Sequence, residues 1–262
     1  MSTLVCFHAH PDDEAISTGG SMAKASAAGH RVVLVVATGG EYGETPSDLA
    51  PEESLRDRRR AETENSAAAL GIHRVVWLGY RDSGMHGWEQ NADPLSFHQA
   101  PIDEAAARLA EILLDERADV LTTYDWHGNY GHPDHVKVHQ VGNLAGSLAA
   151  TPVIYEATMN RDALARFMEA ARAAGEMPEG PPQTDDGNPF GSPETDLTTA
   201  VDVTGFLGAK RAALRAHASQ ISDTSFFLTM PDEVFATAFG TEWFIRRGAP
   251  GGIHESDLAE LR

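Results

Sequence analysis

The segment Arg31–Ala37 (RVVLVVA) restricts the fold more than any other part of the chain. It is apolar after its first residue and rich in β-branched side chains, which is typical of a parallel strand buried on both faces. Similar runs predict further strands at Thr3–Phe7, Arg74–Leu78, Val120–Thr123 and Val153–Glu156. Helical spacing of apolar residues falls between or after them, at 102–113, 141–148 and 164–171. This alternation predicts an α/β fold, a doubly wound and mostly parallel sheet with helices on both faces.

The length of 262 residues fits a single α/β domain, since such domains often reach about 250 residues. The pattern is lost at residues 176–199, which contain five prolines and no lysine or arginine. Long loops without a function are uncommon, so we predict a loop or lid insertion that sets substrate specificity. A solvated insertion without a role is the alternative. A helix at Gly205–Gln220 and a Phe-rich tail follow, and the tail belongs either to the core or to an interface.

The charge of the chain disfavours several classes of partner. The 39 acidic and 20 basic residues give a formal net charge of −19, whereas binding to nucleic acid or to an anionic membrane needs a basic face. The apolar run Val32–Ala37 is too short to span a bilayer, so no membrane insertion is expected. The first residues lack the basic region of a signal peptide, and the single cysteine excludes an intrachain disulfide. The simplest prediction is a cytoplasmic protein.

Two segments combine imidazoles with carboxylates, namely His8–Glu14 (HAHPDDE) and Gly131–His135 (GHPDH). These side chains suit a divalent metal such as zinc. The first segment follows the first strand, and the second lies beyond the strand at 120–123. In an open parallel sheet both would meet at the carboxyl ends of the strands, together with the polar loops at 39–44 and 80–85. The convergence of four polar loops is stronger evidence for a site than any single histidine.

Several residues of these types have simpler explanations. Asp12 or Asp13 alone would serve as a helix N-cap, and His8 is expected to be structural. Cys6 is expected to be a small buried apolar residue. Three other histidines have no motif that supports them as ligands: His127, His139 and His217.

The two motifs are those of a known family. The chain resembles the PIG-L/LmbE superfamily of metal-dependent N-deacetylases, which includes N-acetylglucosaminyl-phosphatidylinositol deacetylases and the mycothiol-pathway deacetylase and amidase. The resemblance rests on AHPDDE at Ala9–Glu14 and HPDH at His132–His135, and it covers about residues 1–160 well. Further matches are Gly39–Glu41, Arg59–Glu62, Asp82–Met85 and Ala216–Gln220. The resemblance implies a Rossmann-like fold with the active site at the C-terminal strand ends.

The resemblance also implies the centre of the site. His10, Asp13 and His135 match the metal ligands of the family, and three protein ligands leave one position open for water, as catalytic zinc requires. Asp12 matches the general base. Zinc is the default cofactor, but a site of two histidines and one aspartate also accepts Fe²⁺, Co²⁺ or Mn²⁺.

The remaining roles concern the substrate. His132 matches an electrostatic partner or general acid, with Asp134 hydrogen-bonded to it, and Tyr130 can donate to the oxyanion. Four residues match positions at which the family binds its substrate: Arg59, Asp82, Met85 and Glu41. The leaving amine needs a proton, and either Asp12 or His132 can supply it.

The sequence therefore predicts an enzyme that removes an N-acetyl or N-acyl group from a small molecule containing an amino sugar. An amidase that cleaves a thiol conjugate or another N-acyl metabolite uses the same site and is the first alternative. A metal-binding module without catalysis is the second alternative. The sequence does not decide between a monomer and a homo-oligomer.

Overall fold

The computed structural model describes residues 1–173, 184, 186–259 and 261. Its centre is a seven-stranded sheet with the order β3-β2-β1-β4-β5-β7-β6. The strands are β1 (Thr3–His8), β2 (Arg31–Thr38), β3 (Arg74–Tyr80), β4 (Val120–Tyr124), β5 (Val153–Thr158), β6 (Thr199–Asp202) and β7 (Thr241–Arg246). The first five pair in parallel, while β7 is antiparallel to both β5 and β6. The predicted α/β class and all five predicted strands are confirmed.

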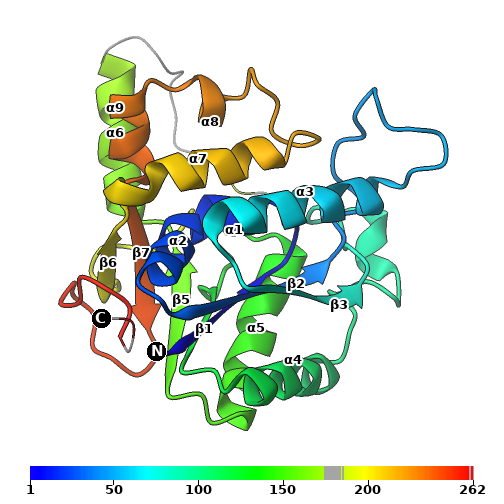
Figure 1. Ribbon diagram of the computed structural model, residues 1–262, viewed down its shortest axis with the longest axis horizontal. Coiled ribbons are helices and arrows are strands. Elements are labelled where there is room, and N and C mark those ends of the chain that lie inside the picture. Colours follow the sequence, from blue (N-terminus) through cyan, green and yellow to red (C-terminus); the bar gives the residue numbers. More distant parts are fainter. Residues whose placement is uncertain (174–183, 185, 260, 262) are drawn as a thin grey trace.

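Helices cover both faces of this sheet (Figure 1). They are α1 (Asp13–Ser17), α2 (Gly19–Ala27), α3 (Leu55–Leu70), α4 (Ile102–Glu116), α5 (Pro133–Leu148), α6 (Arg161–Ala173), α7 (Leu207–Ala216), α8 (Phe226–Thr229) and α9 (Asp232–Phe239). In Figure 1, α1, α2, α3 and α7 lie above the strands, and α4 and α5 lie below them. The fold is therefore doubly wound and Rossmann-like.

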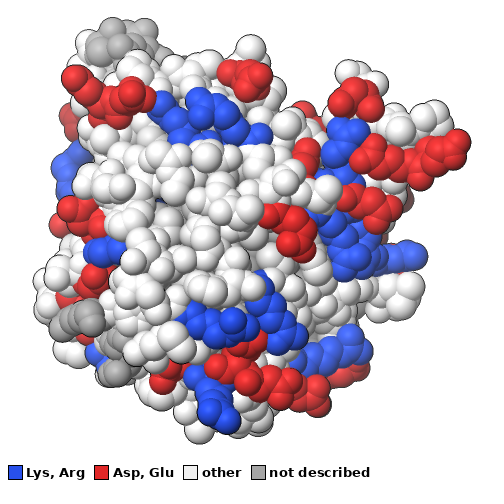
Figure 2. Space-filling model, in the orientation of Figure 1, with Lys and Arg blue, Asp and Glu red and all other residues white. Residues whose placement is uncertain are grey.

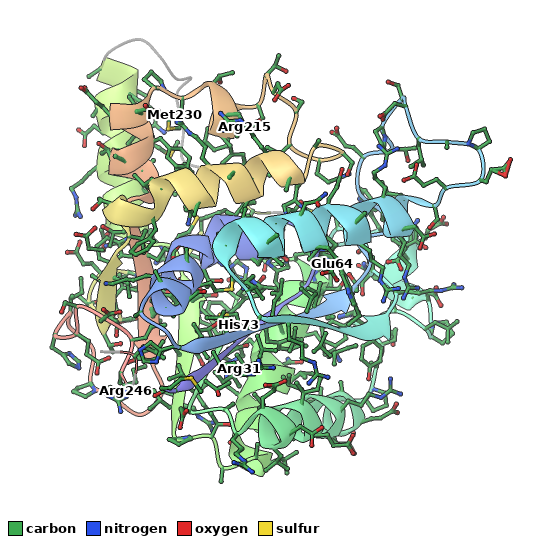
Figure 3. All side chains as sticks on the ribbon, in the orientation of Figure 1. Arg31, Glu64, His73, Arg215, Met230 and Arg246 are labelled. Carbon is green, nitrogen blue, oxygen red and sulfur yellow. The ribbon has the colours of Figure 1, made fainter. Side chains whose placement is uncertain are left out.

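The strand order reverses between β1 and β4. From β1 the chain moves outward through β2 to β3, and it then returns to pair β4 with the other edge of β1. At such a reversal the loops after the two strands separate and leave a crevice at the carboxyl ends. The loops after β1 and β4 carry the two histidine motifs. Figure 3 labels Arg31 and His73 at the opposite end, where β2 and β3 begin.

The C-terminal part differs from the expectation in one respect. Instead of one helix over 205–220, a short 3-10 turn at Thr204–Phe206 precedes α7, which ends at Ala216. The chain leaves the helix because tertiary hydrogen bonds hold the next residues: Ser219 donates to Glu62, and Gln220 bonds to the backbone of Glu44.

The aromatic tail contributes to the core. Phe235 and Phe244 are 2% and 0% exposed, and Phe239 packs against Phe235 with ring centroids 4.9 Å apart. Phe226 remains 58% exposed. The predicted insertion at 176–199 lies partly outside the described residues, which omit 174–183 and 185.

The charged groups do not form a continuous basic face on the side shown in Figure 2, where lysine and arginine side chains lie beside acidic ones. Among the helices that the structure describes, none combines the length and apolar character that crossing a membrane demands.

A buried ion pair links α7 to β7. Lys210 on α7 and Glu242 on β7 are 1% and 4% exposed. The Glu242 carboxylate also accepts hydrogen bonds from the backbone of Gly20 and Ser21 at the start of α2.

We expect Lys210→Met to lower the free energy of unfolding by about 3–5 kcal/mol, because it leaves the Glu242 charge buried without its partner. The measurement is urea unfolding. Lys24→Met is the matched control, since its ion pair with Asp257 is partly exposed and contributes at most about 1 kcal/mol. Equal losses for the two variants would contradict the prediction.

Candidate active site

The first half of the site is the turn between β1 and α1. Asp12 lies in this turn with a φ of 97°, a conformation that non-glycine residues rarely adopt. Its backbone N–H donates to the Glu14 carboxylate at 3.0 Å, and its carbonyl accepts from Ala15 and Ile16 and so starts α1. Such strain persists only where the surroundings impose it, and it is concentrated at functional sites.

The second half is the loop from β4 to α5. His132 caps α5: its Nδ1 accepts from the backbone N–H of Asp134 at 3.1 Å, and Pro133 occupies the first turn, where its missing N–H costs nothing. Gly128 has a φ of 59°, and a Cβ there would lie 2.2 Å from the Cβ of His135. The chain therefore needs glycine at this point to bring the loop against the helix.

The two halves bring His10, Asp13 and His135 together. His10 Nδ1 and Asp13 Oδ2 are 3.4 Å apart, His135 Nε2 and Asp13 Oδ2 are 3.4 Å apart, and His10 Nδ1 and His135 Nε2 are 3.3 Å apart. A tetrahedron around a cation with bonds of about 2.0–2.1 Å has edges of about 3.3–3.4 Å. The three atoms therefore have the spacing of one face of a tetrahedral metal site.

The ring nitrogens on the far side of the two histidines are also held. His10 Nε2 lies 3.2 Å from the carboxylate of Asp134, and His135 Nδ1 lies 3.2 Å from the carbonyl of Gly128. Contacts of this kind fix the tautomer and the orientation of metal-binding imidazoles. The donor set and its supports thus fit a borderline divalent cation.

His132 lies close enough to enter other ligand sets. Within the described residues, ligand atoms of His10, His132 and His135 lie within 4.8 Å of one another, and so do those of His10, Asp82, His132 and Asp134. Neither set contains His127, His139 or His217, the histidines for which the sequence gave no supporting motif. His8 is structural, since its ring lies between Tyr124 Oη (2.7 Å) and Thr18 Oγ1 (2.8 Å).

One expected contact is made by a different group. The resemblance implied that Asp134 is hydrogen-bonded to His132. The bond that joins them is donated by the Asp134 backbone N–H, whereas the Asp134 carboxylate accepts from the backbone and hydroxyl of Ser83 and contacts His10. The geometry of the helix start explains the difference, because the His132 ring faces the Asp134 backbone.

Burial shapes the protonation of the site. Burial raises the pKa of Asp12 to about 6, although the neighbouring Arg59 charge opposes the shift. Burial also raises the pKa of Tyr130, so its hydroxyl keeps its proton at neutral pH. Burial, with the charges of His10 and His135, lowers the pKa of His132 well below its usual range.

A cavity of about 200 Å³ opens above these groups. Its lining includes His10, Asp12, Asp13, Tyr130 and His132 from the two motifs, and Arg59, Asp82 and Met85 of the predicted substrate residues. Glu41 is not among the described lining residues; it accepts a hydrogen bond from the backbone of Asp82 at 3.0 Å.

Arg59 links the cavity to the strained turn. Its Nη2 donates to the Pro11 carbonyl at 2.5 Å and lies 3.1 Å from Asp12 Oδ2, while Nη1 donates to the Gly40 carbonyl at 2.8 Å. Arg59 as a whole is only 4% exposed. Arg59 therefore orients Asp12 besides facing the cavity.

Sequence reasoning missed the residues that support the site from behind. Glu14 is fully buried and bonds to Ser66 Oγ at 2.5 Å and to His217 Nε2 at 2.6 Å. Ser66 lies on α3 and His217 directly follows α7, so both partners are distant from Glu14 in the sequence. The AHASQ segment, noted only as a match, was the one available signal for His217.

The described end of the predicted insertion packs against the β4–α5 loop. Asp186 Oδ2 lies 2.7 Å from His127 Nε2, and Gly191 donates to the Asn129 carbonyl at 2.7 Å. The Phe190 ring stacks on Tyr130, with centroids 6.1 Å apart and planes 13° apart. This segment thus adjoins Tyr130 at the cavity.

The fold and the site define a hydrolase with a Rossmann-like α/β fold and a candidate metal centre at the carboxyl ends of its parallel strands. Residues 5–145 match the family described as PIG-L: GlcNAc-PI de-N-acetylase, and the chain belongs to this family of metal-dependent deacetylases.

Curated relatives cover nearly the whole chain. It is 43% identical to the 1D-myo-inositol 2-acetamido-2-deoxy-α-D-glucopyranoside deacetylase of Acidothermus cellulolyticus, over 98% of this chain and 94% of the relative. Identity to the enzyme of the same name from Thermobispora bispora is 40%, over 93% and 88%.

A solved structure supports the same relationship. The N,N'-diacetylchitobiose deacetylase of Pyrococcus horikoshii superposes with a TM-score of 0.61 at 27% identity, over 100% of this chain and 89% of that one.

The Glu14–His217 pair predicts a pH dependence of stability. Burial lowers the pKa of His217, but Glu14 raises it more, so its net pKa is above the usual 6.5. Burial raises the pKa of Glu14, but His217 lowers it more, so its net pKa is below 4.5. The Glu14 contribution is lost as the pH falls through its folded pKa, and that of His217 is lost as the pH rises through its own. The pair therefore stabilises most between pH 4.5 and 6.5.

We expect His217→Gln to lower the free energy of unfolding by about 3 kcal/mol near pH 5.5, and by less as the pH rises through the folded pKa of His217. Urea unfolding at a series of pH values, at constant metal loading, measures this. His86→Gln, at an exposed position, is the control. If the loss in free energy of unfolding of His217→Gln did not change with pH, an ion pair between His217 and Glu14 would be contradicted.

Proposed function

We propose that this enzyme removes the acetyl group from an N-acetylglucosamine unit joined to inositol, the compound class named for its relatives. The observation that carries the proposal is the triangle of ligand atoms beside Asp12, at the floor of a cavity lined by Arg59 and Asp82. A guanidinium and a carboxylate suit the donors and acceptors of sugar hydroxyls.

His10, Asp13 and His135 would hold the cation, and zinc is our first choice, with Fe²⁺, Co²⁺ or Mn²⁺ as alternatives. When bound, the cation supplies Lewis-acid chemistry that polarises the amide carbonyl and acidifies water. We prefer this triad to the sets that include His132, because its three ligand atoms are 3.3–3.4 Å apart and so have the spacing of one face of a tetrahedral site.

Asp12 is the proposed general base. It precedes the ligand Asp13, it lines the cavity, and Arg59 holds one of its oxygens at 3.1 Å. Among the described residues, the other oxygen has no hydrogen-bond partner, so it can accept a proton from the attacking water. A base needs a pKa near the working pH, and burial moves Asp12 in that direction.

Tyr130 and His132 are the proposed donors to the negative charge that develops on the amide oxygen. Both line the cavity, with ring centroids 6.3 Å apart. The low pKa of His132 favours a neutral ring, so we assign return of the proton to the leaving amine to Asp12. Asp134 acts through His10 as a positioning residue, since it contacts that ring at 3.2 Å.

In this proposal residues 1–262 form a single domain, and the described part of the predicted insertion, residues 186–199, helps to set substrate specificity. The stacking of Phe190 on Tyr130 supports this assignment. We also propose a cytoplasmic location, because a chain with one buried cysteine has no disulfide that needs an oxidising compartment.

The Asp12→Asn variant separates the base from the metal site. We expect it to keep the bound metal and to lose about 10²–10⁴-fold in kcat, because the amide cannot accept the proton. Acetate release measures turnover, and elemental analysis measures metal.

His10→Ala is the companion variant, expected to lose metal and turnover together. An Asp12→Asn enzyme with normal kcat would refute the assignment of the base.

The substrate proposal is tested by acetate release from the α-linked N-acetylglucosaminyl inositol, compared with a panel of N-acyl thiol conjugates. We expect a kcat/KM at least about tenfold higher for the first compound. A higher kcat/KM for a thiol conjugate would favour the amidase function instead.

A further inference from the structure

Two exposed aromatic side chains stand at the mouth of the cavity. Trp88 and Tyr42 line it and are 47% and 38% exposed, whereas His10, Asp13 and Asp82 at its floor are 8%, 8% and 5% exposed. Water contact with so much aromatic surface is unfavourable, and exposed aromatic rings at a cavity mouth often mark binding surface. The cavity is therefore polar below and aromatic at its entrance.

The loop that carries Trp88 is ordered by its own hydrogen bonds. The side chain of Asn91 donates to the carbonyls of Ser83 (2.6 Å) and Met85 (3.1 Å), and it accepts from the backbone of Gly87 at 3.0 Å. Trp88 in turn donates its backbone N–H to Met85 at 3.1 Å. Binding therefore requires little ordering of this loop, which preserves affinity.

The ring of Trp88 is also held in place. Gly84 has a φ of 68°, and a Cβ there would lie 2.8 Å from the Trp88 ring. The indole thus packs on the bare backbone of Gly84. The same segment begins at Ser83, which donates to the carboxylate of Asp134 beside the proposed metal ligands. The loop therefore places the ring at a defined position relative to the site of reaction.

The size of the cavity leaves part of a larger substrate outside. Its volume is about 200 Å³, below the roughly 300–1,000 Å³ typical of sites that enclose a drug-sized ligand. With the reacting amide at the buried floor, the sugar that carries it fills the cavity. A second ring must then lie at the mouth, beside Trp88.

We propose that Trp88 is a specificity-determining residue whose indole forms the platform for the second ring of the substrate, the saturated and hydroxylated ring linked to the N-acetylated sugar. This inference rests on the proposed function and extends it to the outer part of the substrate. Saturated six-membered rings present C–H groups on their faces, which pack on the flat apolar face of an aromatic ring. The indole N–H can donate to a hydroxyl at the edge.

The test measures binding of the amine products, which the enzyme does not hydrolyse. Calorimetric titration of the metal-loaded enzyme compares α-glucosaminyl inositol, with two rings, and glucosamine, with one. We expect the wild type to bind the two-ring compound more tightly. Trp88→Ala should reduce this preference about 3- to 10-fold, and Trp88→Phe should retain most of it.

Trp126→Ala is the matched control. Trp126 is 54% exposed and is not among the described residues that line the cavity, so its loss should leave the preference unchanged. An unchanged preference in Trp88→Ala, or an equal reduction in Trp126→Ala, overturns the inference. So does a wild type that binds both compounds equally.

Acetate release from the acetylated forms of the same two compounds separates this inference from the proposed function. Loss of the preference in Trp88→Ala without acetate release by the wild type would refute deacetylation and keep the two-ring binding site. Acetate release by the wild type, together with an unchanged preference in Trp88→Ala, would support deacetylation and refute the role of Trp88.

Discussion

The buried carboxylate of Glu14 holds together the parts of the molecule that form the site. It accepts the backbone N–H of Asp12, and it bonds to Ser66 on α3 and to His217 after α7. A buried carboxylate is costly unless it is paired and hydrogen-bonded, and here all of its partners are supplied. The turn after β1 is therefore held in place by α3 and by the residue directly after α7, which supply none of the proposed metal ligands.

This arrangement explains how Asp12 keeps a backbone conformation that is unfavourable for aspartate. Glu14 binds its N–H, Arg59 binds the carbonyl of the preceding Pro11, and the start of α1 uses its own carbonyl. With three sides fixed, the side chains of Asp12 and Asp13 diverge from adjacent positions. One can then serve as the base while the other faces His10 and His135.

The fold was predictable because it depends on short-range patterns, whereas the proposed ligand triad came from the resemblance of two short motifs to a known family. Runs such as Arg31–Ala37 indicate buried strands, and parallel strands place the ends of β1 and β4 together. The residues that the sequence could not reveal act through tertiary contacts. No local pattern shows that His217 reaches Glu14, or that the Asp134 carboxylate faces Ser83 and His10 rather than His132. The position at which α7 ends was predicted incorrectly for the same reason, because the hydrogen bond from Ser219 to Glu62 is a tertiary contact.

In the proposed function, the parts that determine chemistry are separate from those that determine specificity. The proposed ligands and base lie at strand ends and helix starts, where the sheet and Glu14 fix them. The mouth of the cavity is formed by the loops after β2 and β3, which carry Tyr42 and Trp88. Substitutions of Tyr42 or Trp88 can alter this outer surface without removing a proposed ligand, because the triad takes no side chain from these loops.

The acidic residues of the chain are mostly remote from the cavity. Only three aspartates, Asp12, Asp13 and Asp82, are among the described residues that line it. The net charge of −19 is therefore mainly a property of the solvated surface, and the preference for one substrate over another depends on the few groups around the cavity.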